Sequence, residues 1–189
     1  MTPADGTAGS TAAGGATEGR PGAGAGRYVV LGLGNRIQGD EALGALVVEA
    51  LDRPDGPLAT LPDPGAVEAI DGGTVGLALL PLIEGLDGLV VVDLIDGGRE
   101  PGTLQDLDGT LLLRRDIVMG VHDLGATELL ATLQLMGSMP RRVRVVGIQP
   151  MRVSLGTELT PEVGAAVPAL VAAVVDHLRT WQKEDGSDG

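Results

Sequence analysis

Two acidic residues and one histidine in this sequence are of types that bind metal ions. Glu41 follows a predicted strand and its loop, Asp93 interrupts the apolar run Leu89–Leu94, and His122 lies just before a predicted helix. In open α/β sheets, ligands bind just beyond the carboxyl ends of the strands. We therefore expect Glu41, Asp93 and His122 to converge above the sheet. Two carboxylates and an imidazole, with no thiolate, suit a divalent first-row ion such as nickel or zinc.

Each of these residues also has a purely structural interpretation. Glu41 taken alone, in the first turn of a helix, would stabilise the helix dipole, and the preceding Asp40 is expected to cap that helix. His122 taken alone fits a loop residue as well as a ligand. Asp93 is harder to explain structurally, because an unpaired carboxylate inside an apolar strand costs several kcal/mol. His177, the other histidine, is expected on the solvated face of the last helix.

Two further polar residues follow predicted strand ends. Asp71 is a candidate for orienting a metal ligand or a water molecule, with a capping or turn role as the alternative. Asn35 lies in the loop after the first strand. It is expected to shape that loop together with Gly34, and it is a candidate contact for a substrate backbone.

The elements that must position these residues alternate between strand and helix. Strands are predicted at Arg27–Leu33, Ala66–Ile70, Leu89–Leu94 and Val143–Ile148, with a bent strand or hairpin over Leu104–Leu113. Helices are predicted at Glu41–Leu51, after a cap at Thr74, at Leu124–Met136, and from Thr160-Pro161-Glu162 to Trp181 with a bend near Pro168. This alternation predicts a single α/β domain, with a twisted, mainly parallel sheet of about five strands and helices on both faces.

Both ends of the chain are expected to lie outside this domain. Residues 1–26 are rich in glycine and alanine and carry three charged residues, so they bury too little apolar surface to offset the entropy of ordering. The polar residues 182–189 are expected to be disordered as well. The folded domain is therefore predicted to span residues 27–181.

Composition excludes several classes of function. The chain of 189 residues has no cysteine, which excludes disulfides, thiolate zinc sites and a cysteine nucleophile. A net charge of −13 and only two aromatic residues argue against nucleic acid as a partner. The sequence contains no run of about 18 apolar residues and no secretory signal, so we expect a cytoplasmic protein without a membrane partner.

The loop after the first strand also resembles a nucleotide-binding loop, but its spacing is wrong. Gly32 and Gly34 are followed by a third glycine only at Gly39, which is too late for a dinucleotide fingerprint. Asp40 and Glu41 would repel a pyrophosphate at the helix start. The sequence therefore argues against a nucleotide cofactor.

With these residues in place, the sequence resembles the hydrogenase maturation endopeptidases, which trim the large subunit of nickel–iron hydrogenases. The resemblance covers about Val29 to Arg179, nearly all of the predicted domain. It rests on six motifs in order: GLGNRIQGDEALG (Gly32–Gly44), DGGTVG (Asp71–Gly76), VVVDLID (Val90–Asp96), PGT (Pro101–Thr103), HDLG (His122–Gly125) and VVGIQP (Val145–Pro150).

The resemblance implies both the site and the reaction. The family's metal ligands fall on Glu41, Asp93 and His122, the same positions that the strand-end rule selects. The implied reaction is removal of the C-terminal extension from a large-subunit precursor after nickel insertion, with the nickel ion supplied by that substrate. The alternative is a nickel-binding chaperone or checkpoint protein that binds the same precursor and cuts nothing.

Overall fold

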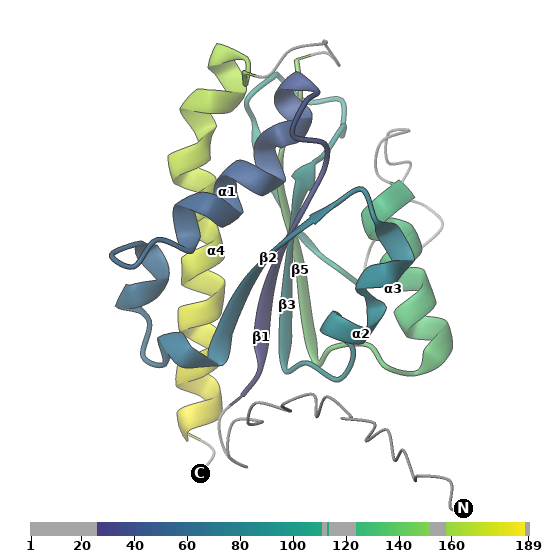
Figure 1. Ribbon diagram of the computed structural model, residues 1–189, viewed down its shortest axis with the longest axis vertical. Helices are drawn as coiled ribbons and strands as arrows, with labels where there is room; N and C mark the ends of the chain where they lie inside the picture. The colour runs from purple at the N-terminus through teal and green to yellow at the C-terminus, as the bar shows by residue number, and fades with distance from the viewer. Residues whose placement is uncertain (1–25, 111–112, 114–123, 152–157, 188–189) are drawn as a thin grey trace, which may run out of the picture.

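The computed structural model describes residues 26–110, 113, 124–151 and 158–187, and these form a five-stranded sheet between two layers of helices (Figure 1). The strands are β1 (Tyr28–Leu33), β2 (Val67–Gly73), β3 (Gly88–Leu94), β4 (Leu104–Asp108) and β5 (Arg142–Ile148). Their order in the sheet is β2-β1-β3-β5-β4. All neighbouring pairs are parallel except β4 and β5. This confirms the expected mainly parallel α/β domain. The head expected to be disordered lies outside the described residues, except for Gly26.

Alternate residues of the central strands bury into two separate cores. Val30 and Val90 face α1 (Leu43–Leu51) and α4 (Pro161–Ser187) on one side of the sheet. Leu31 and Val91 face α2 (Leu80–Ile83) and α3 (Leu124–Met136) on the other side. Helices therefore cover both faces, as the strand–helix alternation predicts (Figure 1).

The last helix is longer than expected. It begins at Pro161, continues through Pro168 and ends at Ser187, so the residues of the tail that the structure describes are helical rather than disordered. Tertiary contacts explain the difference. The buried Gln182 side chain exchanges hydrogen bonds with the backbone of Asp63 at 3.0 and 2.7 Å.

α4 is also, by length and composition alone, apolar enough to cross a membrane, with a mean hydropathy of 1.3 over 18 residues. In this fold one side of it packs on the sheet. Leu170, Val174, Leu178 and Trp181 are all buried there. Of the 18-residue window, 28% is buried in this fold.

Other predicted boundaries move as well. The strand expected over Ala66–Ile70 runs from Val67 to Gly73. The helix expected over Glu41–Leu51 begins as a short 3-10 helix, Gly39–Ala42, before α1. The helix expected to be capped by Thr74 begins as the 3-10 helix Gly76–Leu79, which has no side-chain cap. The strand expected to extend to Leu113 ends at Asp108, where a turn begins.

The second histidine is partly exposed, with 24% of its side chain accessible, and it also makes tertiary contacts. Its Nε2 lies 2.7 Å from the Asp106 carboxylate, and its ring packs on Trp181 with 5.9 Å between ring centroids. His177 thus joins α4 to the edge strand β4, a long-range contact that its sequence neighbours give no sign of.

Candidate active site

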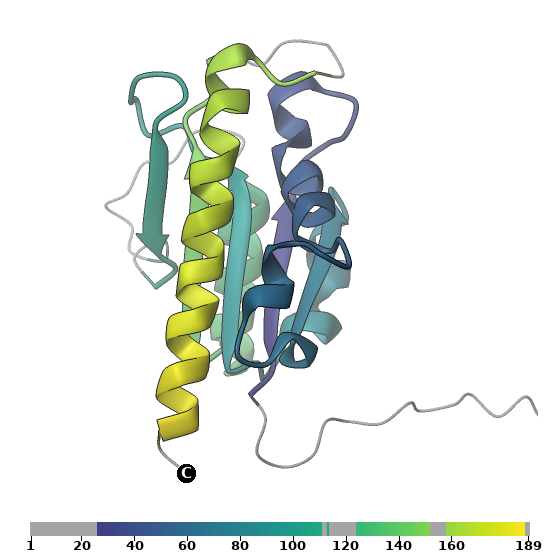
Figure 2. The same cartoon turned by 90° about the vertical axis from the view of Figure 1, so that its left-hand side faces the viewer.

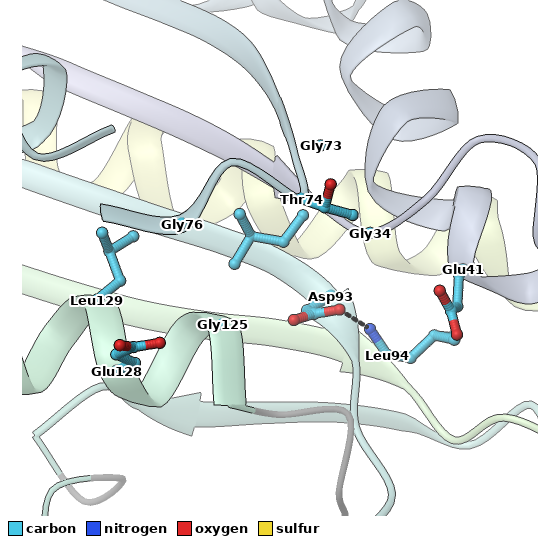
Figure 3. A pocket seen from close by; sticks show the side chains of 11 residues that line it. Gly34, Glu41, Gly73, Thr74, Gly76, Asp93, Leu94, Gly125, Glu128 and Leu129 are labelled. Carbon is cyan, nitrogen blue, oxygen red and sulfur yellow. Dashed lines mark hydrogen bonds between the residues drawn. The ribbon is translucent and has the colours of Figure 1, made fainter. Parts of the chain in front are cut away.

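A pocket of about 260 Å³ opens beyond the carboxyl ends of β1 and β3, where sequence reasoning placed the ligands (Figure 3). Two of the three predicted metal ligands, Glu41 and Asp93, line it together. The remaining lining residues come from the ends of β1 and β3, the end of β2 with the segment after it, and the first turns of α3: Leu33, Gly34, Gly73, Thr74, Gly76, Leu94, Gly125, Glu128 and Leu129.

Asp93 reaches the pocket because of its register in β3. Leu89 and Val91, on the same face of the strand, are fully buried in the core beneath α3. Two residues further on, the carboxylate of Asp93 lies at the pocket, where it accepts the Leu94 N–H at 2.8 Å (Figure 3). The strand is therefore apolar where it is covered and acidic where it leaves the core, which explains how a carboxylate can interrupt an apolar run.

Glu41 is held at the pocket by glycines that allow its backbone to lie directly against the end of β1. Gly34 has a φ of +123°, and a Cβ there would come within 2.1 Å of the Glu41 carbonyl oxygen. A Cβ on Gly44 would come within 2.2 Å of the Leu33 carbonyl oxygen. The glycine-rich loop therefore serves close packing of helix on strand, which brings an acid to the site instead of a phosphate.

Asp40, beside Glu41, has a different role from the expected one. Its side chain is 2% exposed and makes no cap on the helix that follows it. It accepts hydrogen bonds from the backbone N–H of Thr160 at 2.6 Å and from the Thr160 hydroxyl at 3.0 Å. Asp40 thus ties the start of α4 to the active-site loop, 120 residues away along the chain.

Asn35 and Asp71 lie beside the pocket but are not among its lining residues. Asn35 accepts the Ile37 N–H at 3.2 Å and donates to the Gln38 side chain at 3.1 Å, so it shapes the loop as expected. Asp71 accepts from Arg36 at 2.7 Å and from the Gly73 N–H at 3.1 Å. These contacts fix the loop after β1 to the end of β2.

His122 lies outside the described residues. In sequence it is two residues before Leu124, the first residue of α3, and the next residue of that helix, Gly125, lines the pocket. Within the described residues no three His, Asp or Glu side chains are grouped so that they could hold a metal ion. Glu41 and Asp93 supply two carboxylate donors, and a divalent ion of the expected class would need a further ligand such as an imidazole.

Sequence reasoning missed one acidic residue of the site. Glu128 lines the pocket from α3, one helical turn after Gly125 (Figure 3). The sequence could have indicated this, because Glu128 comes three residues after Gly125 and residues three apart lie on the same face of a helix. Thr74, expected only as a helix cap, lines the pocket as well.

Known proteins are similar to this chain both in sequence and in fold. The model of a family described as HycI, hydrogenase maturation protease, matches residues 47–177, a range that includes positions 93 and 122 and begins after Glu41. The hydrogenase expression/formation protein HupD of Rhodobacter capsulatus is 36% identical over 158 residues, which are 82% of this chain and 72% of that protein. The hydrogenase 2 maturation protease of Escherichia coli is 35% identical over 157 residues, 81% of this chain and 91% of the relative.

A solved structure agrees with these sequence matches. The hydrogenase maturating endopeptidase HybD from E. coli superposes with a TM-score of 0.67 at 32% identity, over 82% of this chain and 93% of that one. The fold, the position of the acidic pocket and the sequence matches lead to one conclusion: this chain belongs to the hydrogenase maturation protease family and is a peptidase.

Proposed function

We propose that this peptidase removes the C-terminal extension of a nickel–iron hydrogenase large-subunit precursor after nickel has been inserted. In this proposal Glu41, Asp93 and His122 bind the nickel ion that the precursor carries, and the reaction takes place in the cytoplasm. The nickel ion thus belongs to the substrate. Binding it selects precursors that are ready to be cut.

One observation carries the proposal: Glu41 and Asp93, from separate elements, line the same pocket at the carboxyl edge of the sheet. They are 52 positions apart in the sequence, so only the fold brings them together. The start of α3, which follows His122 in the sequence, borders the same pocket. Two carboxylates and an imidazole are a donor set that suits nickel.

The chemistry of the pocket follows from these groups. A divalent ion bound there would polarise the scissile carbonyl or lower the pKa of a water molecule. Glu41 lies on the 3-10 helix that packs against the end of β1, and Asp93 lies at the end of β3, so two acids face the place where a cation would be bound. Because the chain has no cysteine, a thiol nucleophile is excluded.

The test is an intact-mass measurement on purified large-subunit precursor, with and without nickel, incubated with this protein. The proposal expects loss of a C-terminal peptide from the nickel-loaded precursor alone. Equal cutting of nickel-free precursor would contradict nickel recognition. Binding without any change of mass would instead support the chaperone alternative.

A further inference from the structure

β2 is an edge strand whose carboxyl end leads into the active-site pocket. It stands at one end of the strand order and pairs with β1 alone in the described part of the chain (Figure 2). Its last residue, Gly73, lines the pocket, as do Thr74 and Gly76 directly after it. A chain segment lying along β2 would therefore be directed towards Glu41 and Asp93.

The outer edge of β2 can pair with another strand. Every strand presents alternate backbone N–H and C=O groups to each side, so an edge strand is a template for a further extended chain. Val67–Gly73 contains neither proline nor lysine; its charged residues are the exposed acids Glu68 and Asp71, and Asp71 is paired with Arg36. Its pairing with β1 shifts register between Asp71 and Gly73, a bulge at the point where the strand meets the pocket.

Exposed apolar side chains surround the point where β2 ends. Val75 is 59% exposed and Leu77 is 44% exposed, and both follow the strand directly. Ile37, which is 71% exposed, lies in the loop that Arg36 fixes to Asp71. We call Ile37, Val75 and Leu77 the apolar rim. Exposed apolar side chains at the mouth of a pocket are typical of a surface that binds another chain.

The opposite edge of the sheet offers no comparable route. β4 forms that edge, and none of its residues lines the pocket. The exposed Asp106 on β4 is bound by Arg144 at 2.6 Å and by His177 at 2.7 Å. Of the two edges, only β2 leads to the acids.

We propose that the C-terminal segment of the precursor binds as an extended strand along the outer edge of β2, with apolar side chains on the apolar rim. This inference rests on the proposed function for the identity of the substrate. An endopeptidase must pass its substrate's backbone across the reacting groups. Pairing with β2 sets the direction of the substrate chain and how far that chain reaches into the pocket. Backbone pairing supplies affinity, and the apolar rim supplies preference for apolar side chains.

The first test uses the absence of cysteine from the natural chain. Glu68→Cys on β2 and Thr110→Cys beyond the end of β4 each create a single attachment site for a photoactivated benzophenone, and both positions are exposed. Nickel-loaded precursor is added and irradiated, and the cross-linked peptide is identified by mass spectrometry. We expect cross-links from position 68 to the C-terminal segment and none to that segment from position 110. Cross-links from position 68 to a second copy of this chain, to another part of the precursor, or to nothing would overturn the proposal.

The second test separates binding from cutting. Leu77→Ser should raise KM for nickel-loaded precursor roughly three- to tenfold with kcat unchanged, because an exposed leucine contributes contact area without touching the reacting bond. Leu135→Ser is the matched control, since Leu135 on α3 is 89% exposed and does not line the pocket. An unchanged KM for Leu77→Ser would contradict the role of the apolar rim.

These outcomes are distinguishable from a failure of the proposed function. If the natural protein processes the precursor and position 68 does not cross-link to it, only the docking route is wrong. If the precursor binds, cross-links at position 68 and is never cut, the docking route is supported and the proposed reaction is wrong.

Discussion

At the scale of single residues, the pocket contains two carboxylates, Glu41 and Asp93, that the fold holds in place without enclosing them. Glu41 lies on a one-turn 3-10 helix and Asp93 at the end of an apolar strand, and each is partly buried. Replacing either acid by its amide keeps its size and removes its charge. The resulting change in activity therefore measures how much the charge of that side chain contributes to activity.

The first prediction concerns these two acids. If Glu41 and Asp93 bind the precursor's nickel ion as proposed, Glu41→Gln and Asp93→Asn should each lower precursor processing by roughly 100-fold or more, because each variant removes a charged donor from the proposed ligand set. Their free energies of unfolding should stay within about 0.5 kcal/mol of the natural protein's. Intact-mass time courses and urea unfolding measure the two quantities.

Glu84→Gln is the matched control, since Glu84 is exposed and lies outside the pocket. It should leave both quantities unchanged. Normal processing by both pocket variants would remove these acids from the mechanism.

Replacing Asp40 should lower the free energy of unfolding, because the Asp40 side chain has a structural role. Asp40→Ala leaves the Thr160 N–H and hydroxyl without their buried acceptor, which should cost about 2–4 kcal/mol of unfolding free energy. Asp55→Ala, at an exposed position, should change it by less than about 0.5 kcal/mol. Equal stabilities of the two variants in urea would show that the Asp40–Thr160 contact contributes nothing.

At the scale of elements, the close approach of the active-site loop to β1 depends on glycine. The close contact between Gly44 and the Leu33 carbonyl leaves no room for a side chain. Gly44→Ala should therefore destabilise the protein by about 2–3 kcal/mol and shift Glu41 away from its position. Gly164→Ala in α4 is the contrasting variant, since its new Cβ has no neighbour nearer than 4.0 Å. It should stabilise the protein by about 0.5–1 kcal/mol. Thermal unfolding of the two variants should show shifts of opposite sign.

The sequence predicts those elements whose formation depends on residues close together along the chain. Periodicity and turn residues predict all five strands and the bounds of α3, because these features depend on neighbouring residues. The strand-end rule predicts that Glu41 and Asp93 lie at one edge of the sheet, and the pocket confirms that they do. The partners of Asp40 and His177 were beyond such reasoning, because both contacts join residues that are distant along the chain.

At the scale of the whole molecule, the two ends of the sheet carry different features. The pocket lies at the carboxyl ends of the strands, and a cluster of polar contacts joins their amino ends to the end of α4. In that cluster Asp185 of α4 binds Arg142 at the start of β5, with one nitrogen–oxygen distance of 2.9 Å, and accepts a hydrogen bond from the Tyr28 hydroxyl at the start of β1. This cluster orders the part of the tail that its polar composition suggested would be disordered.

The cluster shifts two pKa values in opposite directions. Hydrogen bonds from Arg142 lower the pKa of Asp185 to about 2, below its ordinary 3.8. Burial, reinforced by the hydrogen bond to Asp185, raises the pKa of Tyr28 to about 12. A lowered acid pKa contributes stability that is complete above about pH 4 and is lost as the pH falls towards 2. The raised Tyr28 pKa contributes stability that is complete below about pH 10 and is lost as the pH rises towards 12.

The last prediction follows from this pH window. Asp185→Asn should lower the free energy of unfolding by about 2 kcal/mol at pH 7, and this difference from the natural protein should shrink as the pH falls from 4 to 2. Asp176→Asn is the matched control, because the Asp176 side chain is 73% exposed and its pairing with Arg179 is local. Urea unfolding across pH 2 to 7 measures the difference. Precursor processing at pH 7 and a temperature well below unfolding should be unchanged in Asp185→Asn, because the cluster and the pocket lie at opposite ends of the strands. A loss of processing in a variant that remains folded would show that the two ends are coupled through the sheet.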